Sequence, residues 1–148
     1  IEIPQNIIKK WGLRVDNPHI TLLYFPETNL YYQTKIARRV QSLLLGTKAF
    51  DVTTRGQDWF GPEKDTRVVL VQPSIDLTEL RLKLFEMLER EFPGMTDKKY
   101  PVYRPHITIG KSDGEYQGIN TDDEFEVDTI IIQLMNKETY KIFCSKSR

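Results

Sequence analysis

Apolar residues that recur three and four positions apart predict two helices in the first third of the chain. The first covers residues 4–11, with proline at an early position and Gly12 directly after it. The second begins near Thr28 or Asn29 and stops at Gly46, since glycine commonly follows the last turn of a helix. The apolar stripe of this second helix consists of Tyr32, Ile36, Val40, Leu43 and Leu44.

A third helix has the clearest apolar face in the chain. Asp76 and Glu79 have capping-box spacing, with Asp in place of the usual Ser or Thr, and they predict its start. Pro93 and Gly94 predict its end, because proline cannot continue a helix. The predicted buried face consists of Leu77, Leu80, Leu84, Met87 and Leu88.

Runs rich in β-branched and aromatic residues predict strands between and after these helices. They cover residues 20–24, 50–54, 68–71, 107–109, 129–135 and 140–143. Residues 136–139 predict the turn of a C-terminal hairpin. Residues 57–66 hold Trp59 and Phe60 among charges and predict a surface loop with exposed aromatics, and residues 111–123 predict a polar loop.

The order of these elements predicts an α+β fold class with an internal duplication. No linker, low-complexity tract or shift of composition divides the chain, so we expect residues 1–148 to form a single domain. The 148 residues are enough to bury a core without metals or disulfides. The lone cysteine, Cys144, lies in an apolar stretch and is expected to be a buried strand thiol.

The charge balance narrows the possible partners. Lys and Arg number 21, as do Asp and Glu, and this balance argues against a protein that binds duplex DNA. A nucleotide or short oligonucleotide, held by a few local charges, fits it. No apolar run approaches the length of a membrane span and no secretory segment is visible, so a cytoplasmic protein is expected.

The chemistry is concentrated in the two histidines of the chain, which stand in the same tetrapeptide, Pro-His-Ile-Thr. One copy covers residues 18–21 and the other residues 105–108, and an aliphatic residue follows each. By chance, three matching neighbours would arise about once in 10⁴ trials at ordinary residue frequencies. Side chains two apart in a strand share a face, so each histidine is expected to project together with its threonine.

Two imidazoles and two hydroxyls at one point suit the cleavage of a phosphodiester. His19 and His106 can act as general acid and general base near neutral pH, and the residues leave open which has which role. Thr21 and Thr108 would hydrogen-bond the phosphate oxygens. This chemistry needs no metal and no cofactor. A zinc site is the sharpest alternative, although a catalytic zinc takes three protein ligands and no suitable third ligand is spaced near either motif.

At these residues the chain resembles the two-histidine phosphoesterase superfamily (LigT-like, or 2′,5′ RNA ligase-like), which is defined by two His-x-Thr/Ser motifs. The resemblance implies a bilobal, duplicated fold: two small antiparallel sheets, backed by helices, around a central cleft that holds the four motif residues. Residues 1–4 resemble the end of the family's first strand, and most of that strand is absent from this sequence.

The resemblance also implies a substrate class. Family members act on RNA or nucleotide phosphodiesters next to a ribose hydroxyl, and some viral and phage members destroy cyclic or 2′,5′-linked immune signals. We therefore expect a metal-independent phosphodiesterase for a small cyclic or 2′,5′-linked oligonucleotide. One alternative is an RNA end-processing enzyme or 2′,5′ RNA ligase that acts on 2′,3′-cyclic phosphates. The other is a noncatalytic nucleotide-binding domain.

Five further residues are candidate substrate ligands. Arg104 shares strand parity with His106 and is placed to reach a phosphate, and Lys111 follows the second motif directly. Trp59 or Phe60 could stack on a base, and Tyr103 could contact the substrate. Ordinary roles compete with each assignment: a solvated cation for Arg104 and Lys111, and packing for the three aromatic residues. The oligomeric state is not predicted.

Overall fold

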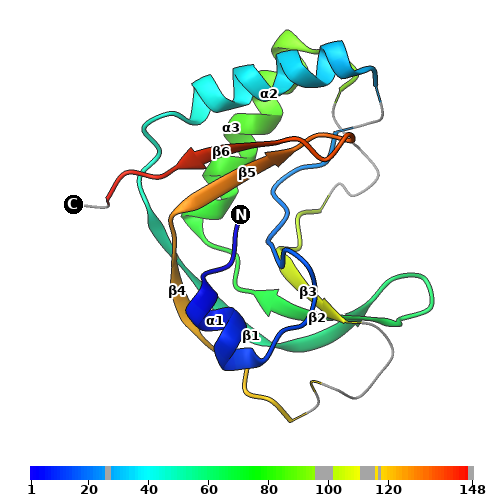
Figure 1. The fold of residues 1–148 in the computed structure, drawn as a ribbon, viewed down its shortest axis with the longest axis vertical. Coiled ribbons are helices and arrows are strands. Elements are labelled where there is room, and N and C mark those ends of the chain that lie inside the picture. The colour runs from blue at the N-terminus through cyan, green and yellow to red at the C-terminus, as the bar shows by residue number, and fades with distance from the viewer. Residues whose placement is uncertain (26–27, 96–101, 111–115, 117, 147–148) are drawn as a thin grey trace.

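Helices and antiparallel strands alternate along the chain, which confirms the predicted α+β class (Figure 1). The computed structural model describes residues 1–25, 28–95, 102–110, 116 and 118–146. None of the helices in these ranges is long and apolar enough to cross a membrane. The elements are α1 (Gln5–Trp11), α2 (Leu30–Leu44), β1 (Phe50–Phe60), β2 (Thr66–Val71), α3 (Ile75–Glu91), β3 (His106–Gly110), β4 (Glu124–Val127), β5 (Thr129–Gln133) and β6 (Thr139–Phe143).

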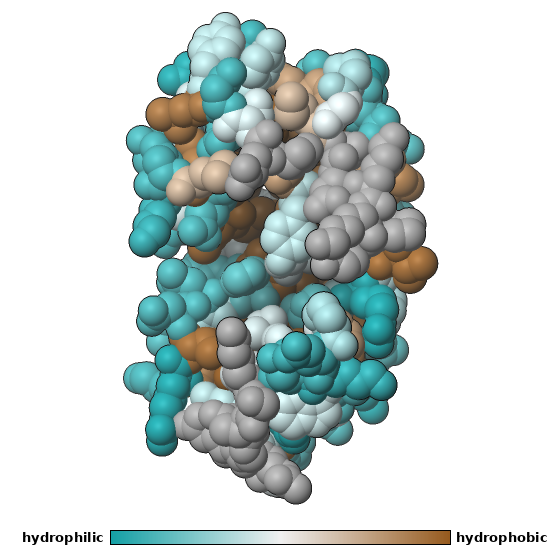
Figure 2. Space-filling view, turned by 90° about the vertical axis from the view of Figure 1, so that its right-hand side faces the viewer, coloured by the Kyte–Doolittle hydropathy of each residue, from teal (hydrophilic) through white to brown (hydrophobic). Residues whose placement is uncertain are grey.

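The strands form a curled four-stranded antiparallel sheet, in the order β3-β2-β1-β4, and a two-stranded sheet of β5 and β6. The chain follows a C-shaped path, with β5, β6 and α2 at one end and β1, β2 and β3 at the other (Figure 1). Figure 2 looks onto the open side, where the surface is hollowed between the two ends. The curl therefore turns one face of the four-stranded sheet toward the opposite half of the molecule.

The N-terminal residues connect the two sheets. Glu2 N donates to Thr129 O of β5 at 3.1 Å, and Glu2 also forms an antiparallel bridge with His19. The next residue of that segment, Ile20, forms an antiparallel bridge with Ile107 of β3. The segment that carries the first histidine therefore lies between the N-terminal residues and β3.

The three predicted helices are confirmed, with one correction at a helix start. Gly12 ends α1 in the left-handed conformation with φ 68°, and the side chain of Asn29 caps α2 by accepting from Tyr32 N. In α3 the N-cap is Ser74, whose Oγ accepts from Leu77 N at 3.2 Å, so the capping box assigned to Asp76 and Glu79 is wrong. Every residue of the predicted α3 core face is buried, namely Leu77, Leu80, Leu84, Met87 and Leu88.

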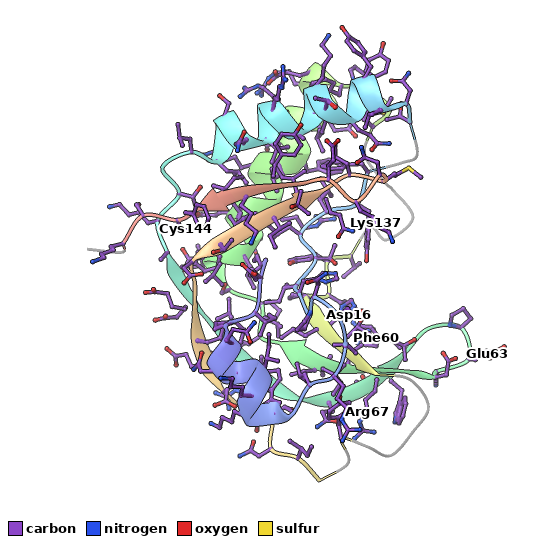
Figure 3. The ribbon with its side chains drawn as sticks, viewed as in Figure 1. Asp16, Phe60, Glu63, Arg67, Lys137 and Cys144 are labelled. Atoms are coloured by element: carbon purple, nitrogen blue, oxygen red, sulfur yellow. The ribbon has the colours of Figure 1, made fainter. Side chains whose placement is uncertain are left out.

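The predicted surface loop over residues 57–66 is wrong for half of its length, since residues 57–60 belong to β1 and Thr66 to β2. Trp59 pairs with Arg67 and Phe60 with Thr66 in the ladder, and only residues 61–65 form the turn. Phe60 and Arg67 extend to opposite sides of the sheet (Figure 3). This charged run is thus a strand pair whose two faces both carry polar side chains.

Two other strand assignments differ from expectation. Residues 21–25 are not a regular strand, because beyond the bridges of His19 and Ile20 no partner strand follows them within the described residues. Conversely, β4 was not predicted: it is four residues long, and only Phe125 and Val127 are buried. The predicted C-terminal hairpin is confirmed, and Lys137, with φ 71°, lies in its turn. Cys144 follows β6 and is half-buried, and burial raises the pKa of its thiol.

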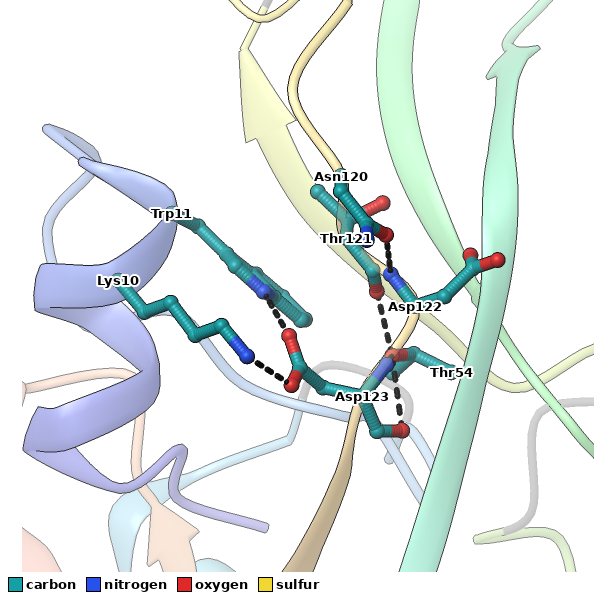
Figure 4. A network of polar contacts seen from close by, with 7 residues as sticks. All are labelled: Lys10, Trp11, Thr54, Asn120, Thr121, Asp122 and Asp123. Atoms are coloured by element: carbon teal, nitrogen blue, oxygen red, sulfur yellow. Dashed lines mark hydrogen bonds and ion pairs between the residues drawn. The ribbon is translucent and has the colours of Figure 1, made fainter.

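A polar network ties α1 to the junction of β1 and β4 (Figure 4). The Asp123 carboxylate accepts from Lys10 Nζ at 2.6 Å and from Trp11 Nε1 at 2.7 Å. Its backbone N–H donates to Thr54 Oγ1 at 2.9 Å, and this hydroxyl donates to Thr121 O at 2.6 Å. Burial alone would raise the pKa of Asp123, but the hydrogen bonds from Lys10 and Trp11 outweigh it and lower that pKa.

Candidate active site

The two His-x-Thr motifs lie side by side in opposite directions, because Ile20 forms an antiparallel bridge with Ile107. This register sets His19 opposite Thr108 and Thr21 opposite His106. The four polar side chains share one face, on which His19 and Thr108 are exposed, and Thr21 and His106 are partly buried. The alternate residues, Ile20, Leu22, Ile107 and Ile109, are buried, as strand parity predicts.

This pairing sets the distance between the backbone positions from which the two imidazoles extend. His19 and His106 are diagonal neighbours across the strand pair, a relation that separates backbones by about 7–8 Å in antiparallel sheets. Side chains as long as histidine reach across that distance.

The two imidazoles are oriented by equivalent hydrogen bonds, each between Nδ1 and the carbonyl oxygen two residues earlier in the chain. His19 Nδ1 lies 2.8 Å from Asn17 O, and His106 Nδ1 lies 2.7 Å from Arg104 O. Since a carbonyl oxygen only accepts, Nδ1 carries the proton in each ring. The neutral ring then presents the lone pair of Nε2, and the protonated ring presents Nε2–H.

The proline before each histidine is part of this arrangement. Pro18 and Pro105 are both buried, and each separates a histidine from the carbonyl that its ring contacts. Proline fixes its own φ and favours extended backbone in the residue before it. Asn17, before the first proline, departs from this preference: its φ is 49°, a left-handed conformation that asparagine adopts more readily than most residues. The repeat of proline was visible in the sequence, but its role was not.

Tyr103 anchors the first motif to the second. Its hydroxyl donates to Thr21 O at 2.9 Å, so a residue next to the second motif holds the backbone of the first. Burial raises the pKa of Tyr103 to about 12, and the nearby Arg81 only partly opposes this shift. Tyr103 therefore stays a neutral hydrogen-bond donor across the working range of most enzymes.

Phe60 and Arg104 border the ring of His106. Phe60 meets it edge to face, with the ring centroids 4.7 Å apart. The Arg104 guanidinium lies over the same phenyl ring at 4.5 Å, and its Nη2 is 4.0 Å from Asp58 Oδ2. The two predicted ligands thus stand beside the histidine, with the cation exposed.

The other predicted ligands are placed differently. Trp59 stacks under Arg67, whose Cζ is 4.8 Å from the centre of the indole ring. Because successive residues of a strand point to opposite faces, Trp59 and Phe60 lie on different faces of the sheet. Geometry therefore favours Phe60 over Trp59 as the aromatic contact of a substrate at His106. Lys111 lies outside the described residues. Within those residues, no group of three His, Cys, Asp or Glu side chains lies close enough to hold a metal ion.

A family model and two solved structures are similar to this chain. The model of the family described as the 2′-5′ RNA ligase superfamily matches residues 9–130, which include both motifs. No curated protein gives a significant sequence match.

Two solved structures share the fold at low sequence identity. The crystal structure of TT0787 of Thermus thermophilus aligns with a TM-score of 0.69 at 12% identity, and the alignment covers 100% of this chain and 97% of that one. A second structure, described as a phosphoesterase, aligns with a TM-score of 0.61 at 17% identity, covering 98% of this chain and 92% of that one.

Proposed function

The chain belongs to the 2′-5′ RNA ligase superfamily, and from that membership we propose that it is a metal-independent phosphodiesterase that uses two histidines on one phosphate. The observation that carries the proposal is the antiparallel bridge between Ile20 and Ile107. It supports a site in which both histidines and both threonines of the repeated motif face the same group. In this proposal the bridged segment of the first motif and β3 are the equivalent parts of a duplicated, two-lobed domain, with the site between the lobes.

In the proposed reaction, Nε2 of one histidine removes the proton from the attacking ribose hydroxyl or water. The oxygen of that nucleophile forms a bond to phosphorus, and the bond from phosphorus to the leaving oxygen breaks. Nε2–H of the other histidine gives its proton to the leaving oxygen. The carbonyls that accept from Nδ1 hold both rings in orientation.

The threonines have a separate role in this proposal. Thr21 and Thr108 each lie opposite the histidine of the other motif, so their hydroxyls flank the same phosphate from two sides. A hydroxyl can donate to a non-bridging oxygen and so stabilise charge that develops there. Each threonine also shares a face with its own histidine, which makes the two halves of the site equivalent in composition.

We further propose a small cyclic or 2′,5′-linked oligonucleotide as the substrate. The equal numbers of acidic and basic residues support few rather than many phosphate contacts. Binding of such a ligand should weaken only slightly as salt rises, whereas long RNA would give a steep dependence. Measuring the binding constant over a range of salt concentrations separates the two.

The test of the activity is a panel of substrates incubated with the purified protein in excess EDTA. The panel contains 2′,5′-oligoadenylate, cyclic oligonucleotides, 2′,3′-cyclic mononucleotides and 3′,5′-linked RNA. The proposal expects cleavage of the first or second class and a bell-shaped dependence of rate on pH, since one group must be neutral and the other protonated. Cleavage only of 2′,3′-cyclic phosphates, or formation of 2′,5′ junctions, would instead identify an RNA end-processing enzyme or ligase. Binding of nucleotides without any turnover would identify a noncatalytic domain.

A further inference from the structure

A β-bulge in β1 places an arginine that the sequence did not single out. Thr54 pairs with Val71 and Gln57 with Val69, so Arg55 and Gly56 together oppose the single residue Leu70. Gly56 takes a positive φ of 73°, which glycine adopts without strain, and its N–H donates to Asp122 Oδ1 at 2.6 Å. Bulges of this kind redirect side chains and are common next to active sites.

The bulge puts Arg55 in the same row of the sheet as the second histidine. Leu70, which Arg55 opposes, pairs on its other side with His106 of β3. Residues that pair directly across strands point to the same face. Two strand spacings separate the backbones of Arg55 and His106, or about 10 Å, which is within reach of an arginine and a phosphate between them.

A shallow pocket of about 350 Å³ lies along this row. Two guanidinium groups border it, from Arg55 and from Arg104, and the amide of Gln72 adds a further donor. Apolar surface beneath them comes from Leu70, Pro73 and Pro105. None of the described residues that line it carries a carboxylate, so these residues give the pocket a positive charge.

Arg104 is available to an anion, and Arg55 borders both this pocket and a neighbouring recess that Asp122, Asp123 and Glu124 line. The ion pair of Arg104 with Asp58 is long, at 4.0 Å, and the Arg104 side chain is 62% exposed. Arg55 is exposed and forms no ion pair with any described residue. Planar guanidinium groups bind phosphate through paired hydrogen bonds, and apolar surface nearby suits a sugar or base.

We propose that this pocket binds a second phosphate of the substrate, next to the one that is cleaved, with Arg55 as its main ligand. This inference rests on the proposed function and narrows its substrate class. A nucleotide that carries two phosphate groups would be preferred over one that carries only the scissile phosphate. Oligonucleotides of two or more linkages, and cyclic dinucleotides, meet that requirement, and a 2′,3′-cyclic mononucleotide does not.

The experiment compares three probes in excess EDTA: 2′,3′-cyclic AMP, 2′,5′-linked diadenylate with one phosphate, and 2′,5′-linked triadenylate with two. Wild type is expected to cleave the trimer with a kcat/KM about 10- to 100-fold above that of the dimer, the range of one charge-assisted contact. In Arg55→Gln this preference for the trimer collapses. The slope of log affinity against log salt for the trimer also falls by about 0.7. Arg38→Gln removes the same charge from an exposed position on α2 and should leave the preference intact.

The outcomes separate this inference from the proposed function. If wild type cleaves dimer and trimer equally, if Arg55→Gln lowers both alike, or if only the cyclic mononucleotide is cleaved, the second-phosphate pocket is wrong. If neither these probes nor the cyclic oligonucleotides of the panel are cleaved, the proposed activity fails, and equilibrium binding of triadenylate then tests the pocket. Equal dissociation constants for wild type and Arg55→Gln would overturn it.

Discussion

At the residue scale, the two copies of the Pro-His-Ile-Thr motif share a hydrogen-bonding arrangement as well as a sequence. Each histidine ring contacts the carbonyl two residues before it, across a buried proline, at 2.8 Å in the first motif and 2.7 Å in the second. A short stretch of sequence thus contains both the histidine that we propose as an acid–base group and the carbonyl that orients its ring. The site depends little on distant side chains for the orientation of its two rings.

This arrangement predicts the tautomer of both histidines. In the neutral state the proton should be on Nδ1 in each ring, because each Nδ1 faces an oxygen that cannot donate. Long-range ¹⁵N–¹H correlation spectra of the imidazoles can be read without assignment problems, since the chain has only two histidines. Neutral rings protonated on Nε2 would contradict the proposed geometry.

Tyr103→Phe tests the link between the motifs. Loss of the hydroxyl leaves Thr21 O without its donor and should lower the free energy of unfolding by about 1 kcal/mol. Because folding raises the pKa of Tyr103 from 10.0 to about 12, the folded protein keeps a proton that the unfolded chain releases above pH 10. Wild-type stability should therefore fall as pH rises through that window, and the variant should lack this part of the fall.

Ultraviolet titration of the tyrosines measures the pKa of Tyr103 directly. Of the seven tyrosines in wild type, one should ionise near pH 12, and that component should be missing from Tyr103→Phe. Loss of a component that ionises near the usual tyrosine pKa of 10.0, rather than near 12, would show that Tyr103 is not the buried donor described.

At the scale of elements, local patterns were predictable and nonlocal pairings were not. The buried face of α3 followed from helical period alone, and all five of its predicted residues are buried. Its cap was misassigned because Asp76 and Glu79 mimic a capping box two residues after the real cap, Ser74. Local signals locate a helix more reliably than they locate its first residue.

The strands depend on pairings between distant parts of the chain, which local sequence patterns did not predict. The charges among residues 57–66 predict a loop, yet residues 57–60 extend β1 because β2 supplies partners for their backbone. Arg55 could not have been found, since its direction depends on a bulge that exists only in the register between β1 and β2. The histidines and threonines were found because their signal, a repeated tetrapeptide, is written in the sequence itself.

Asp123→Asn tests the joint between α1 and the sheet. The Asp123 side chain is only 12% exposed and accepts from Lys10 and Trp11, so loss of its charge should lower the free energy of unfolding by about 2 kcal/mol at neutral pH. Since folding lowers the pKa of Asp123, its contribution is present above the usual aspartate pKa of 3.8 and is lost as pH falls through the lowered value.

Urea unfolding over a range of pH measures this contribution. The difference between wild type and Asp123→Asn should be largest near neutrality and should shrink below pH 3.8. Asp51→Asn, an exposed position on β1, is the matched control and should change stability little. A difference that is independent of pH would show that the ionised carboxylate is not what joins α1 to β1 and β4.

At the scale of the whole molecule, the curl of the four-stranded sheet brings together motifs from opposite parts of the chain. The N-terminal residues join β5, and the first motif then lies against β3, so the two sheets meet at the paired motifs. Neither half contains a complete acid–base pair. The two histidines are therefore expected to act as a unit rather than as independent contributors to the rate.

A double-mutant cycle tests most directly whether the two histidines act as a unit. The kcat/KM of wild type, His19→Ala, His106→Ala and the double variant would be compared in excess EDTA on the best substrate of the panel. Each single change should lower the rate by about 10²- to 10⁴-fold, and the double change should lower it by about as much as the worse single change. An activity that survives either single change, or a double variant slowed by the product of the two effects, would contradict a site in which both histidines serve one phosphate.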